Sequence, residues 1–303
     1  MHQSPASRHL PALYAPPQPG AASEPPYLSL VIPAFNEERR LGPTLESVLS
    51  YLASRPYRSE VIVVSDGSTD GTARVTRAAF ARVAGEPRLS TRFHHYSPNA
   101  GKGKAVRTGV LMTRGQFVAF TDADLSTPIE EIERALAYLE GHAAPPDGSA
   151  STPAAARQGG RYRIVIGSRA AAGAAIARYQ PLYRRLSAKG FNVVRDALVG
   201  IHGLRDTQCG LKVFEGEIAR AIFGRQRING FMFDVETLFI AQRLGIPILE
   251  LGVRWADAPE SKVRLSSGLR LIPDLLRIRL LHGRLSPADA PRILAAAPAT
   301  IAS

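Results

Sequence analysis

The sequence predicts a single α/β domain built on a mostly parallel β-sheet with flanking helices. From Tyr27 onward, short apolar runs rich in β-branched residues alternate with longer helix-like segments, a pattern typical of strands joined by crossover helices. Polar clusters follow several of these runs, at the place where an open parallel sheet binds its ligands. The chain has 303 residues, a length at which one large domain can bury a substantial core.

The first half of the chain carries the regular part of this pattern. Its strands are expected at residues 28–34, 60–65, 92–96, 116–121 and 163–167. The helices between them are expected at about 43–54, from Thr69 onward, at 102–113 and at 128–140. The last of these has an acidic first turn, which suits the positive end of a helix dipole.

The second half is less regular and should add C-terminal amphipathic helices. We expect a basic, partly amphipathic helix over 181–199, a helix over 231–244, a strand over 246–255 and a last helix over 268–285. No internal repeat is visible. These elements therefore extend one domain instead of forming a second copy of it.

The folded domain is expected to span residues 27–285. Residues 1–26 contain seven prolines and no apolar run of signal-peptide length, so they should form a disordered tail. Residues 143–160 are rich in Ala, Pro, Gly and Ser, which predicts a flexible insertion. Residues 286–303 are Ala-rich and interrupted by proline, which predicts a second disordered tail.

Composition excludes several classes of protein. The single cysteine, Cys209, rules out a disulfide scaffold and fits a reducing compartment. No stretch approaches 18 uncharged apolar residues, so no transmembrane helix is expected. The formal net charge of +12 predicts anionic partners. A nucleic-acid-binding protein is the least favoured reading, because the chain has no RNA-binding motif and only 7% aromatic residues.

Three polar clusters follow strands one, two and four of the predicted sheet. They are Asn36-Glu37, Asp66-Gly67-Ser68 and Asp122-Ala123-Asp124. Any one alone would suit a surface turn, but at successive strand ends they predict a joint site. The Asp122-x-Asp124 pair offers hard oxygen ligands to Mg²⁺ or Mn²⁺. The alternative for this pair is capping of the following helix.

A Gly101-Lys102-Gly103-Lys104 loop opens the third predicted helix. It offers backbone N–H groups, the helix dipole and two ammonium groups to a phosphate. The full P-loop spacing is missing and no GxGxxG follows the first strand, which disfavours an NTPase and excludes a dinucleotide-binding motif. The loop therefore predicts phosphate binding of another kind.

Two further features lie in the second half. Cys209 has no histidine beside it, so we expect a packed thiol and no nucleophile. Asp234 and Glu236 lie in an apolar stretch, where an uncompensated carboxylate would be costly. They could orient an acceptor, pair with basic residues or, for Asp234, act as a general base.

Seven motifs together resemble a known enzyme family. VIPAFNEE (31–38), DGSTDGT (66–72), NAGKGKAVRTG (99–109) and DADLSTP (122–128) resemble the family 2 glycosyltransferases of GT-A fold. More narrowly, DTQCGLKVF (206–214), FDVE (233–236) and SKVRL (261–265) look like those of dolichyl-phosphate β-glucosyltransferases and related polyprenyl-phosphate glycosyltransferases. Glu260 stands where relatives often carry Gly.

On the donor side, the resemblance implies a nucleotide-sugar pocket. Asp122 would face the ribose and the metal, and Asp124 would bind the metal directly. The cation, Mg²⁺ or Mn²⁺, would bridge the two phosphates of the donor and neutralise the departing diphosphate. The remaining pocket residues would be Pro33, Phe35, Glu37, Asp66 and Lys102.

On the acceptor side, the resemblance implies a phosphate site made by basic residues. Arg169 would be its catalytic member, together with Asp234 if a base is used. The other residues expected to face the acceptor phosphate are Arg184, Arg185, Lys189, Gln208 and Lys262. For the basic residues of 184–189, a solvated helix face is the alternative.

The expected activity is inverting, metal-dependent transfer of glucose from UDP-glucose to a polyprenyl phosphate. Mannosyl transfer from GDP-mannose and transfer to a soluble acceptor remain the alternatives. On the predicted helix after Leu269, Arg270, Arg277 and Arg284 form one stripe beside Leu and Ile residues, which predicts binding to an anionic membrane surface. The alternative is an ordinary packed helix with one solvated face. We therefore expect a cytoplasmic protein that is peripherally attached to the cytoplasmic face of a membrane.

Overall fold

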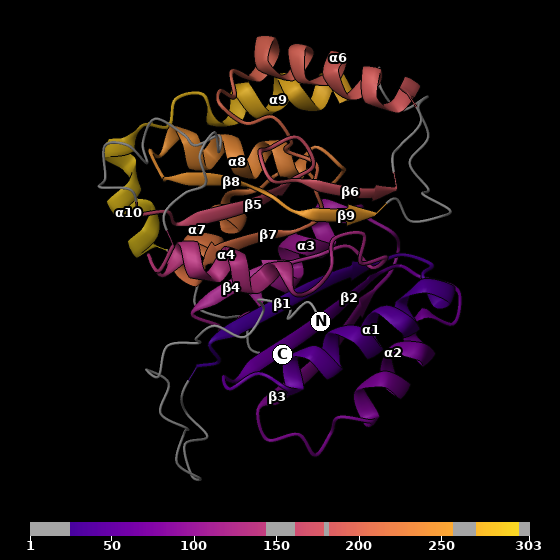
Figure 1. The fold of residues 1–303 in the computed structure, drawn as a ribbon. Coiled ribbons are helices and arrows are strands. Elements are labelled where there is room, and N and C mark those ends of the chain that lie inside the picture. The colour runs from indigo at the N-terminus through magenta and orange to yellow at the C-terminus, as the bar shows by residue number, and fades with distance from the viewer. Residues whose placement is uncertain (1–24, 144–160, 179–181, 257–270, 297–303) are drawn as a thin grey trace, which may run out of the picture.

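A computed structural model describes residues 25–143, 161–178, 182–256 and 271–296. Most of the expected insertion and both chain ends lie outside these ranges. The described parts form one α/β unit in which helices cover a central sheet (Figure 1). The predicted fold class is confirmed.

The central sheet has seven strands in the order β3-β2-β1-β4-β7-β5-β8. All neighbouring pairs are parallel except those made by β7, which runs antiparallel to β4 and to β5. A separate pair, β6 with β9, lies beside the main sheet. The strands are β1 (Leu28–Ala34), β2 (Ser59–Asp66), β3 (Leu89–Tyr96), β4 (Phe117–Phe120), β5 (Ile164–Ser168), β6 (Ala175–Arg178), β7 (Lys212–Glu215), β8 (Ile248–Gly252) and β9 (Arg254–Ala256).

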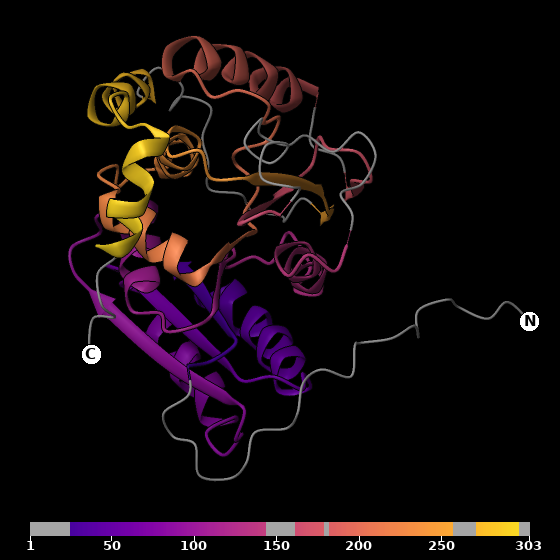
Figure 2. The same ribbon diagram turned by 90° about the vertical axis from the view of Figure 1, so that its left-hand side faces the viewer.

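The helices cover both faces of this sheet (Figure 2). They are α1 (Glu38–Ala53), α2 (Thr72–Ala81), α3 (Lys102–Leu111), α4 (Glu131–Leu139), α6 (Leu182–Val199), α7 (Gly216–Arg225), α8 (Phe233–Arg243), α9 (Ile272–His282) and α10 (Ala290–Ala295). Leu30 and Ile32 pack in one core with α1, α2 and α4, whereas Val31 packs in a second core with α3, α7 and α8. This alternation follows from the pleat of a strand that is buried on both faces.

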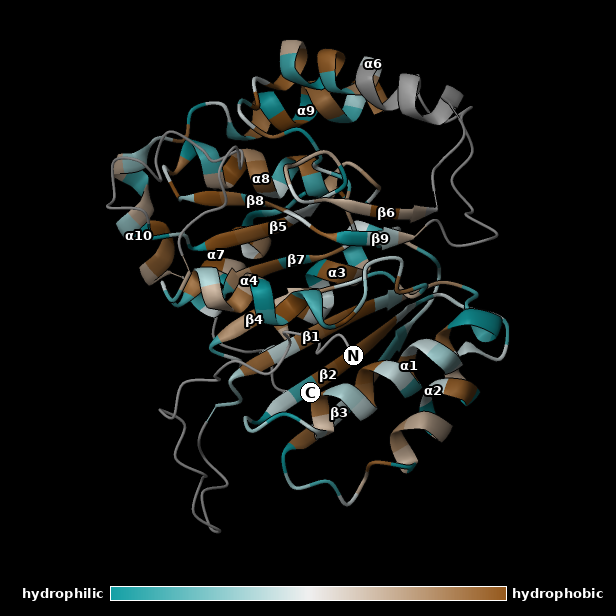
Figure 3. Ribbon diagram, in the orientation of Figure 1, coloured by the Kyte–Doolittle hydropathy of each residue, from teal (hydrophilic) through white to brown (hydrophobic). Residues whose placement is uncertain are grey.

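The apolar strands account for most of the interior. The strands β1, β2 and β8 are largely brown in the hydropathy view (Figure 3), and every residue of these three strands is buried. Continuous apolar runs are expected where a parallel sheet is covered on both sides. The sheet is therefore a rigid base for the loops at its carboxyl edge.

Several elements differ from the sequence prediction. The strand β7 and the helix α7 were not predicted, because a four-residue run such as KVFE carries too little periodicity to identify a strand. The strand predicted over 246–255 is two strands, β8 and β9, which belong to different sheets.

The chain after Leu285 also differs from the disordered tail that we predicted. It contains a 3₁₀ turn over Pro287–Asp289 and the helix α10. Ser286 caps the turn through its hydroxyl and backbone N–H, both bound to the Asp289 carboxylate. Ile293 is only 3% exposed in the core shared with α7 and α8. A buried anchor therefore orders this short segment despite its prolines.

Candidate active site

The loops after β1 and β2 are tied together by hydrogen bonds. Asn36, with φ of 53°, donates its backbone N–H to the Ser68 hydroxyl at 3.0 Å. Its side-chain oxygen accepts from the Thr69 N–H at 2.8 Å. The Glu37 N–H donates to the Thr72 hydroxyl at 2.8 Å. The first two predicted clusters therefore form one structure at the carboxyl edge of the sheet.

Asp66 fixes the loop that precedes α3. It is 2% exposed, and its carboxylate accepts the backbone N–H groups of Ala100 at 2.7 Å and Gly101 at 2.9 Å. The Asn99 amide donates to it at 2.9 Å. A carboxylate that accepts several N–H groups holds a loop strongly, because such bonds are charge-assisted. Here Asp66 positions the loop that carries Lys102.

The start of α3 requires glycine. Gly101 has φ of +107°, a left-handed conformation that L-residues rarely adopt. A Cβ at this position would lie 2.5 Å from the carbonyl oxygen of Asn229, and one at Gly103 would lie 2.7 Å from that of Ile228. The glycines therefore allow the loop between α7 and α8 to pack directly against the beginning of α3.

Lys102 and Asp122 form the central ion pair of the site. The Lys102 ammonium lies 2.6 Å from Asp122 Oδ1. Burial opposes charge on both groups, but their mutual attraction outweighs it. The pKa of Lys102 is therefore raised and the pKa of Asp122 is lowered. Lys102 thus stays cationic and Asp122 anionic at neutral pH.

The second oxygen of Asp122 faces Gly210. A Cβ on Gly210 would overlap Asp122 Oδ2 and lie 2.7 Å from Asp122 Cγ. The absence of a side chain at Gly210 therefore lets the Asp122 carboxylate pack directly against the backbone of this glycine. An anionic carboxylate two residues from a second carboxylate has the chemistry that Mg²⁺ and Mn²⁺ prefer. Asp122 and Asp124 therefore fit a divalent cation, although no group of three or more His, Cys, Asp or Glu within metal-binding reach occurs among the described residues.

Asp124 is held from two sides. Its Oδ1 accepts the backbone N–H of Ser126 at 3.1 Å and the Ser126 hydroxyl at 3.0 Å, which closes a local turn. The alternative role, capping of the following helix, is not seen, because α4 begins at Glu131 and its N-cap is Glu130. Its Oδ2 lies 3.7 Å from an Arg40 nitrogen. Arg40 in turn binds both oxygens of Glu37, at 2.6 and 2.7 Å. Glu37 therefore touches this part of the site through Arg40.

A buried ion pair lies close to these groups. Pairing with a basic residue was one of the roles expected for Asp234, but the sequence did not identify Lys212 as the partner. Lys212 is fully buried, and its ammonium donates to the Cys209 carbonyl at 2.8 Å and pairs with Asp234 Oδ1 at 2.7 Å. Burial of Asp234 outweighs the attraction of Lys212 and Lys102, so its pKa is raised. The signal in the sequence was a lysine in one apolar run and two carboxylates, Asp234 and Glu236, in another. A charged group in such a run needs a partner when it is buried.

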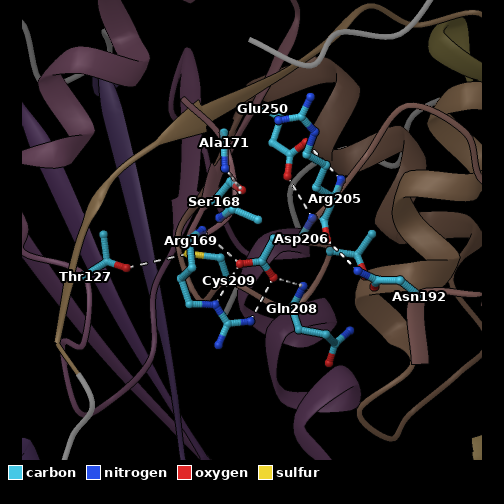
Figure 4. Close-up of polar contacts among 12 residues, drawn as sticks. Thr127, Ser168, Arg169, Ala171, Asn192, Arg205, Asp206, Gln208, Cys209 and Glu250 are labelled. Carbon is cyan, nitrogen blue, oxygen red and sulfur yellow. Dashed lines mark hydrogen bonds and ion pairs between the residues drawn. The ribbon is translucent and has the colours of Figure 1, made fainter. Parts of the chain in front are cut away.

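Arg169 is held by Asp206 in a bidentate pair. Its guanidinium nitrogens lie 2.7 and 2.8 Å from the two carboxylate oxygens, and its backbone N–H donates to Asp206 at 3.0 Å (Figure 4). Burial works against the charge of Arg169, but the bonds to Asp206 prevail and raise its pKa. Its charge also helps to lower the pKa of Asp122, so this pair belongs to the same electrostatic site.

The loop around Asp206 contains two more predicted or notable residues. Gln208 donates its backbone N–H to Asp206 at 3.2 Å, and its side-chain nitrogen is buried with no hydrogen-bond partner in the protein. Cys209 is 1% exposed, 3.7 Å from the Thr127 hydroxyl, and burial raises its pKa. A buried thiol with a raised pKa is the packed, unreactive cysteine that the sequence predicted.

The remaining predicted residues lie at the margins of the described site. Pro33 is buried in β1, and Phe35 is 41% exposed just after that strand. Arg184, Arg185 and Lys189 belong to α6, but their side chains lie outside the described part of the chain, and Lys262 lies outside the described residues. The predicted residues that the fold brings together are Lys102, Asp122, Asp124, Arg169 and Asp234.

The sequence from Ser29 to Asp206 matches the model of glycosyl transferase family 2. The chain belongs to this family. It is therefore a glycosyltransferase, and the strand-end clusters above lie within the matched region.

Curated relatives extend the similarity beyond the matched region. The chain is 36% identical over 261 residues to the human dolichyl-phosphate beta-glucosyltransferase, covering 84% of this chain and 75% of the relative. A Trichomonas vaginalis dolichyl-phosphate beta-glucosyltransferase is 35% identical over 261 residues, covering 84% of this chain and 71% of the relative. The similarity thus includes much of the second half of this glycosyltransferase.

Solved structures share the fold at lower identity. Glucosyl-3-phosphoglycerate synthase from Mycobacterium tuberculosis, in complex with Mn²⁺, UDP and its product, matches with a TM-score of 0.54 and 19% identity over 85% of this chain and 80% of that one. Mannosyl-3-phosphoglycerate synthase from Rubrobacter xylanophilus matches with a TM-score of 0.53 and 19% identity over 86% and 76%. The fold of this glycosyltransferase is therefore GT-A.

Among the helices that the structure describes, none combines the length and the apolar character needed to cross a bilayer.

Proposed function

We propose that this glycosyltransferase transfers glucose from UDP-glucose to a polyprenyl phosphate of the dolichyl type, with inversion at the anomeric carbon. The observation that carries the proposal is the similarity, over 84% of the chain, to enzymes named dolichyl-phosphate beta-glucosyltransferase. The UDP in the structure of the mycobacterial neighbour supports the same choice of nucleotide. The geometry of the site supports the chemistry as follows.

The donor diphosphate would bind between α3 and the end of β4. Lys102 supplies a cation 2.6 Å from Asp122 at a helix N-terminus, where a phosphate is stabilised by charge and by backbone N–H groups. Asp122 and Asp124 would hold Mg²⁺ or Mn²⁺, and the cation would neutralise the leaving diphosphate. Lys102 would exchange its bond to Asp122 for one to a donor phosphate when the donor binds.

The acceptor would enter from the side of Arg169. This residue is 26% exposed at its side chain and is fixed by Asp206, so it offers a positioned positive charge to an acceptor phosphate. The unpaired Gln208 nitrogen lies in the same loop and could donate to that phosphate. Arg184, Arg185, Lys189 and Lys262 are proposed to add charge from the neighbouring segments.

The proposed reaction needs no protein base. A phosphate monoester has a second pKa near ~6 and is mostly dianionic at neutral pH, so its oxygen can attack without losing a proton. Asp234 is 3% exposed and bound to Lys212, which suits an internal ion pair better than a base that must reach the acceptor. We expect Asp234→Asn to retain measurable transfer; loss of the chemical step with both substrates bound, restored at higher pH, would show that a base exists.

A membrane-facing surface would bring the enzyme to a lipid-linked acceptor. The helices α6 and α9 pack together at one end of the molecule (Figure 1). Leu280 is 83% exposed, Val193 is 69% exposed, and Leu276 and Leu281 are also exposed. Exposed Arg277 and Arg284 flank the leucines, as in helices that lie on anionic lipid. Arg270 of the predicted stripe lies outside the described residues.

This surface can be tested by flotation with liposomes. Anionic liposomes should carry the protein in low salt, whereas neutral liposomes or high salt should weaken the binding. Leu280→Ser with Leu281→Ser should reduce it under all conditions. Negligible binding in every condition would contradict the proposal that this surface attaches the enzyme to the cytoplasmic face of a membrane.

The activity is tested with a matrix of donors and acceptors. Labelled UDP-glucose and GDP-mannose are each incubated with polyprenyl phosphate or with 3-phosphoglycerate, and the label is measured in the organic and aqueous phases. We expect organic label from UDP-glucose alone. Organic label from GDP-mannose would favour the mannosyl alternative, and label on phosphoglycerate would favour the soluble acceptor that the two structural neighbours use by name.

A further inference from the structure

Two buried glutamates support the two halves of the candidate site in the same way. Glu236, on α8, is fully buried and accepts the backbone N–H groups of Arg227 at 2.8 Å and Ile228 at 2.7 Å. Glu250, on β8, is fully buried and accepts those of Arg205 at 2.9 Å and Asp206 at 2.7 Å. Each carboxylate therefore binds two successive N–H groups of one loop.

The loop held by Glu236 lies under the start of α3. The carbonyl oxygen of Asn229 accepts the Lys104 N–H at 3.2 Å, which satisfies one of the free N–H groups of a helix N-terminus. The Gln226 amide donates to the carbonyls of Gly103 at 2.9 Å and Ile228 at 2.7 Å. The loop therefore sets the position of the segment that carries Lys102.

Glu236 is also the point where α9 joins this loop. His282, the last residue of α9, is 6% exposed and lies 2.7 Å from Glu236 Oε1. The same glutamate thus binds the loop beneath α3 and the end of a helix whose exposed side carries both leucine and arginine residues. Removal of its charge should loosen both connections, because an amide offers only one acceptor oxygen where the carboxylate offers two.

The loop held by Glu250 lies on the other side of the site. Asp206, whose N–H it binds, holds Arg169 through both carboxylate oxygens and also accepts the Gln208 N–H (Figure 4). The position of Arg169 therefore depends on Asp206, and that of Asp206 on Glu250. No comparable contact joins Glu250 to the start of α3 among the described residues.

We propose that Glu236 and Glu250 are separate positioning residues, Glu236 for the donor-phosphate loop and Glu250 for the acceptor-phosphate loop. The proposal rests on the proposed function for the names of the two ligands. The independence of the two loops rests on the hydrogen bonds alone. Each glutamate acts through backbone N–H groups and touches no substrate.

The chain offers a matched control in Glu60. This glutamate is 1% exposed and accepts the Arg114 N–H at 2.6 Å and a nitrogen of Arg92 at 2.7 Å. It lies near the beginning of β2, at the sheet edge opposite the site. Glu60→Gln removes the same kind of buried charge and should lower stability without changing either substrate loop.

The test compares Glu236→Gln, Glu250→Gln and Glu60→Gln in the full chain. Binding of UDP-glucose with Mn²⁺ is measured by calorimetry, and the KM for polyprenyl phosphate by transfer. Glu236→Gln should weaken donor binding by about tenfold with little change in the acceptor KM, and Glu250→Gln should do the reverse, because each loses one charge-assisted hydrogen bond. Equal effects on both ligands, or effects matched by Glu60→Gln, would overturn the proposal.

Hydrogen exchange separates this inference from the proposed function. Glu236→Gln should increase exchange at residues 101–105 and 226–230 and leave 205–210 unchanged, and Glu250→Gln should give the opposite pattern. Failure of the unmodified chain to bind UDP-glucose would overturn the proposed function, while the exchange pattern would still decide this inference. If Glu236→Gln does not fold, His282→Leu removes one partner of the carboxylate and should also increase exchange at residues 101–105 and 226–230. An equal increase at 205–210 would contradict the proposal.

Discussion

Replacement of Gly210 by alanine should displace Asp122 and remove most activity. The new Cβ would overlap Asp122 Oδ2 and lie 2.7 Å from Asp122 Cγ, whereas carbon atoms in contact are separated by about 3.5–4.0 Å. The carboxylate must therefore move by roughly 1 Å from its place beside Lys102. The backbone of Gly210 is not in the left-handed region, so the clash of the side chain is the main perturbation.

A displacement of this size should lower kcat about 100-fold, because catalytic geometry is sensitive to shifts of 1 Å. Overpacking should cost about 1–3 kcal/mol of stability. The assay is transfer of label from UDP-glucose to polyprenyl phosphate, accompanied by thermal unfolding. Gly42→Ala is the control, because a Cβ on Gly42 meets nothing within 4 Å. A folded Gly210→Ala enzyme with the kinetic constants of the unmodified protein would refute the placement of Asp122 in the site.

Three further predictions concern the charges of the site. Asp124→Asn, or excess chelator, should abolish transfer while leaving the unfolding temperature nearly unchanged. Added Mg²⁺ or Mn²⁺ should restore the activity of the chelator-treated enzyme but not that of the variant. Full turnover in chelator would contradict the metal assignment. Lys212→Met should destabilise the fold by about 3–5 kcal/mol because Asp234 is left buried and unpaired, and denaturant unfolding of Lys212→Met/Asp234→Asn should recover part of this loss. Arg169 lowers the pKa of Asp206 despite burial. This pair therefore stabilises the fold above the ordinary aspartate pKa of about 3.9, and the effect is lost as pH falls through the lower pKa of the folded state. The difference in unfolding free energy between the unmodified chain and Asp206→Asn should be constant at neutral pH and shrink below about pH 4.

The sequence was informative about the loops that follow β1, β2 and β4 because its signals there are local. The strands before Asn36, Asp66 and Asp122 are continuous apolar runs, and parallel strands place their carboxyl ends at one edge. The expected meeting of these clusters follows from that geometry. The observed bonds of Asn36 to Ser68 and Thr69 join residues 32 and 33 positions apart in sequence.

The other half of the site depends on pairings that no local pattern encodes. The strand β7 is four residues long and enters the sheet antiparallel between β4 and β5, so neither its existence nor its direction could be predicted. The sequence therefore did not identify a partner for Lys212, at the start of β7. Arg169 and Asp206, which also pair, are 37 positions apart. Buried charges in the sequence indicated that partners exist, but the fold alone selects them.

The central claim is that glucose passes from UDP-glucose to a lipid-linked phosphate. A competition experiment tests it most directly: UDP-glucose labelled in the sugar is given to the enzyme with equal concentrations of polyprenyl phosphate and 3-phosphoglycerate in the presence of Mn²⁺. The account predicts that the label enters the organic phase as a β-linked glucosyl phosphate and that little reaches phosphoglycerate. Label found mainly on phosphoglycerate, or left on UDP-glucose while GDP-mannose is consumed under the same conditions, would contradict it.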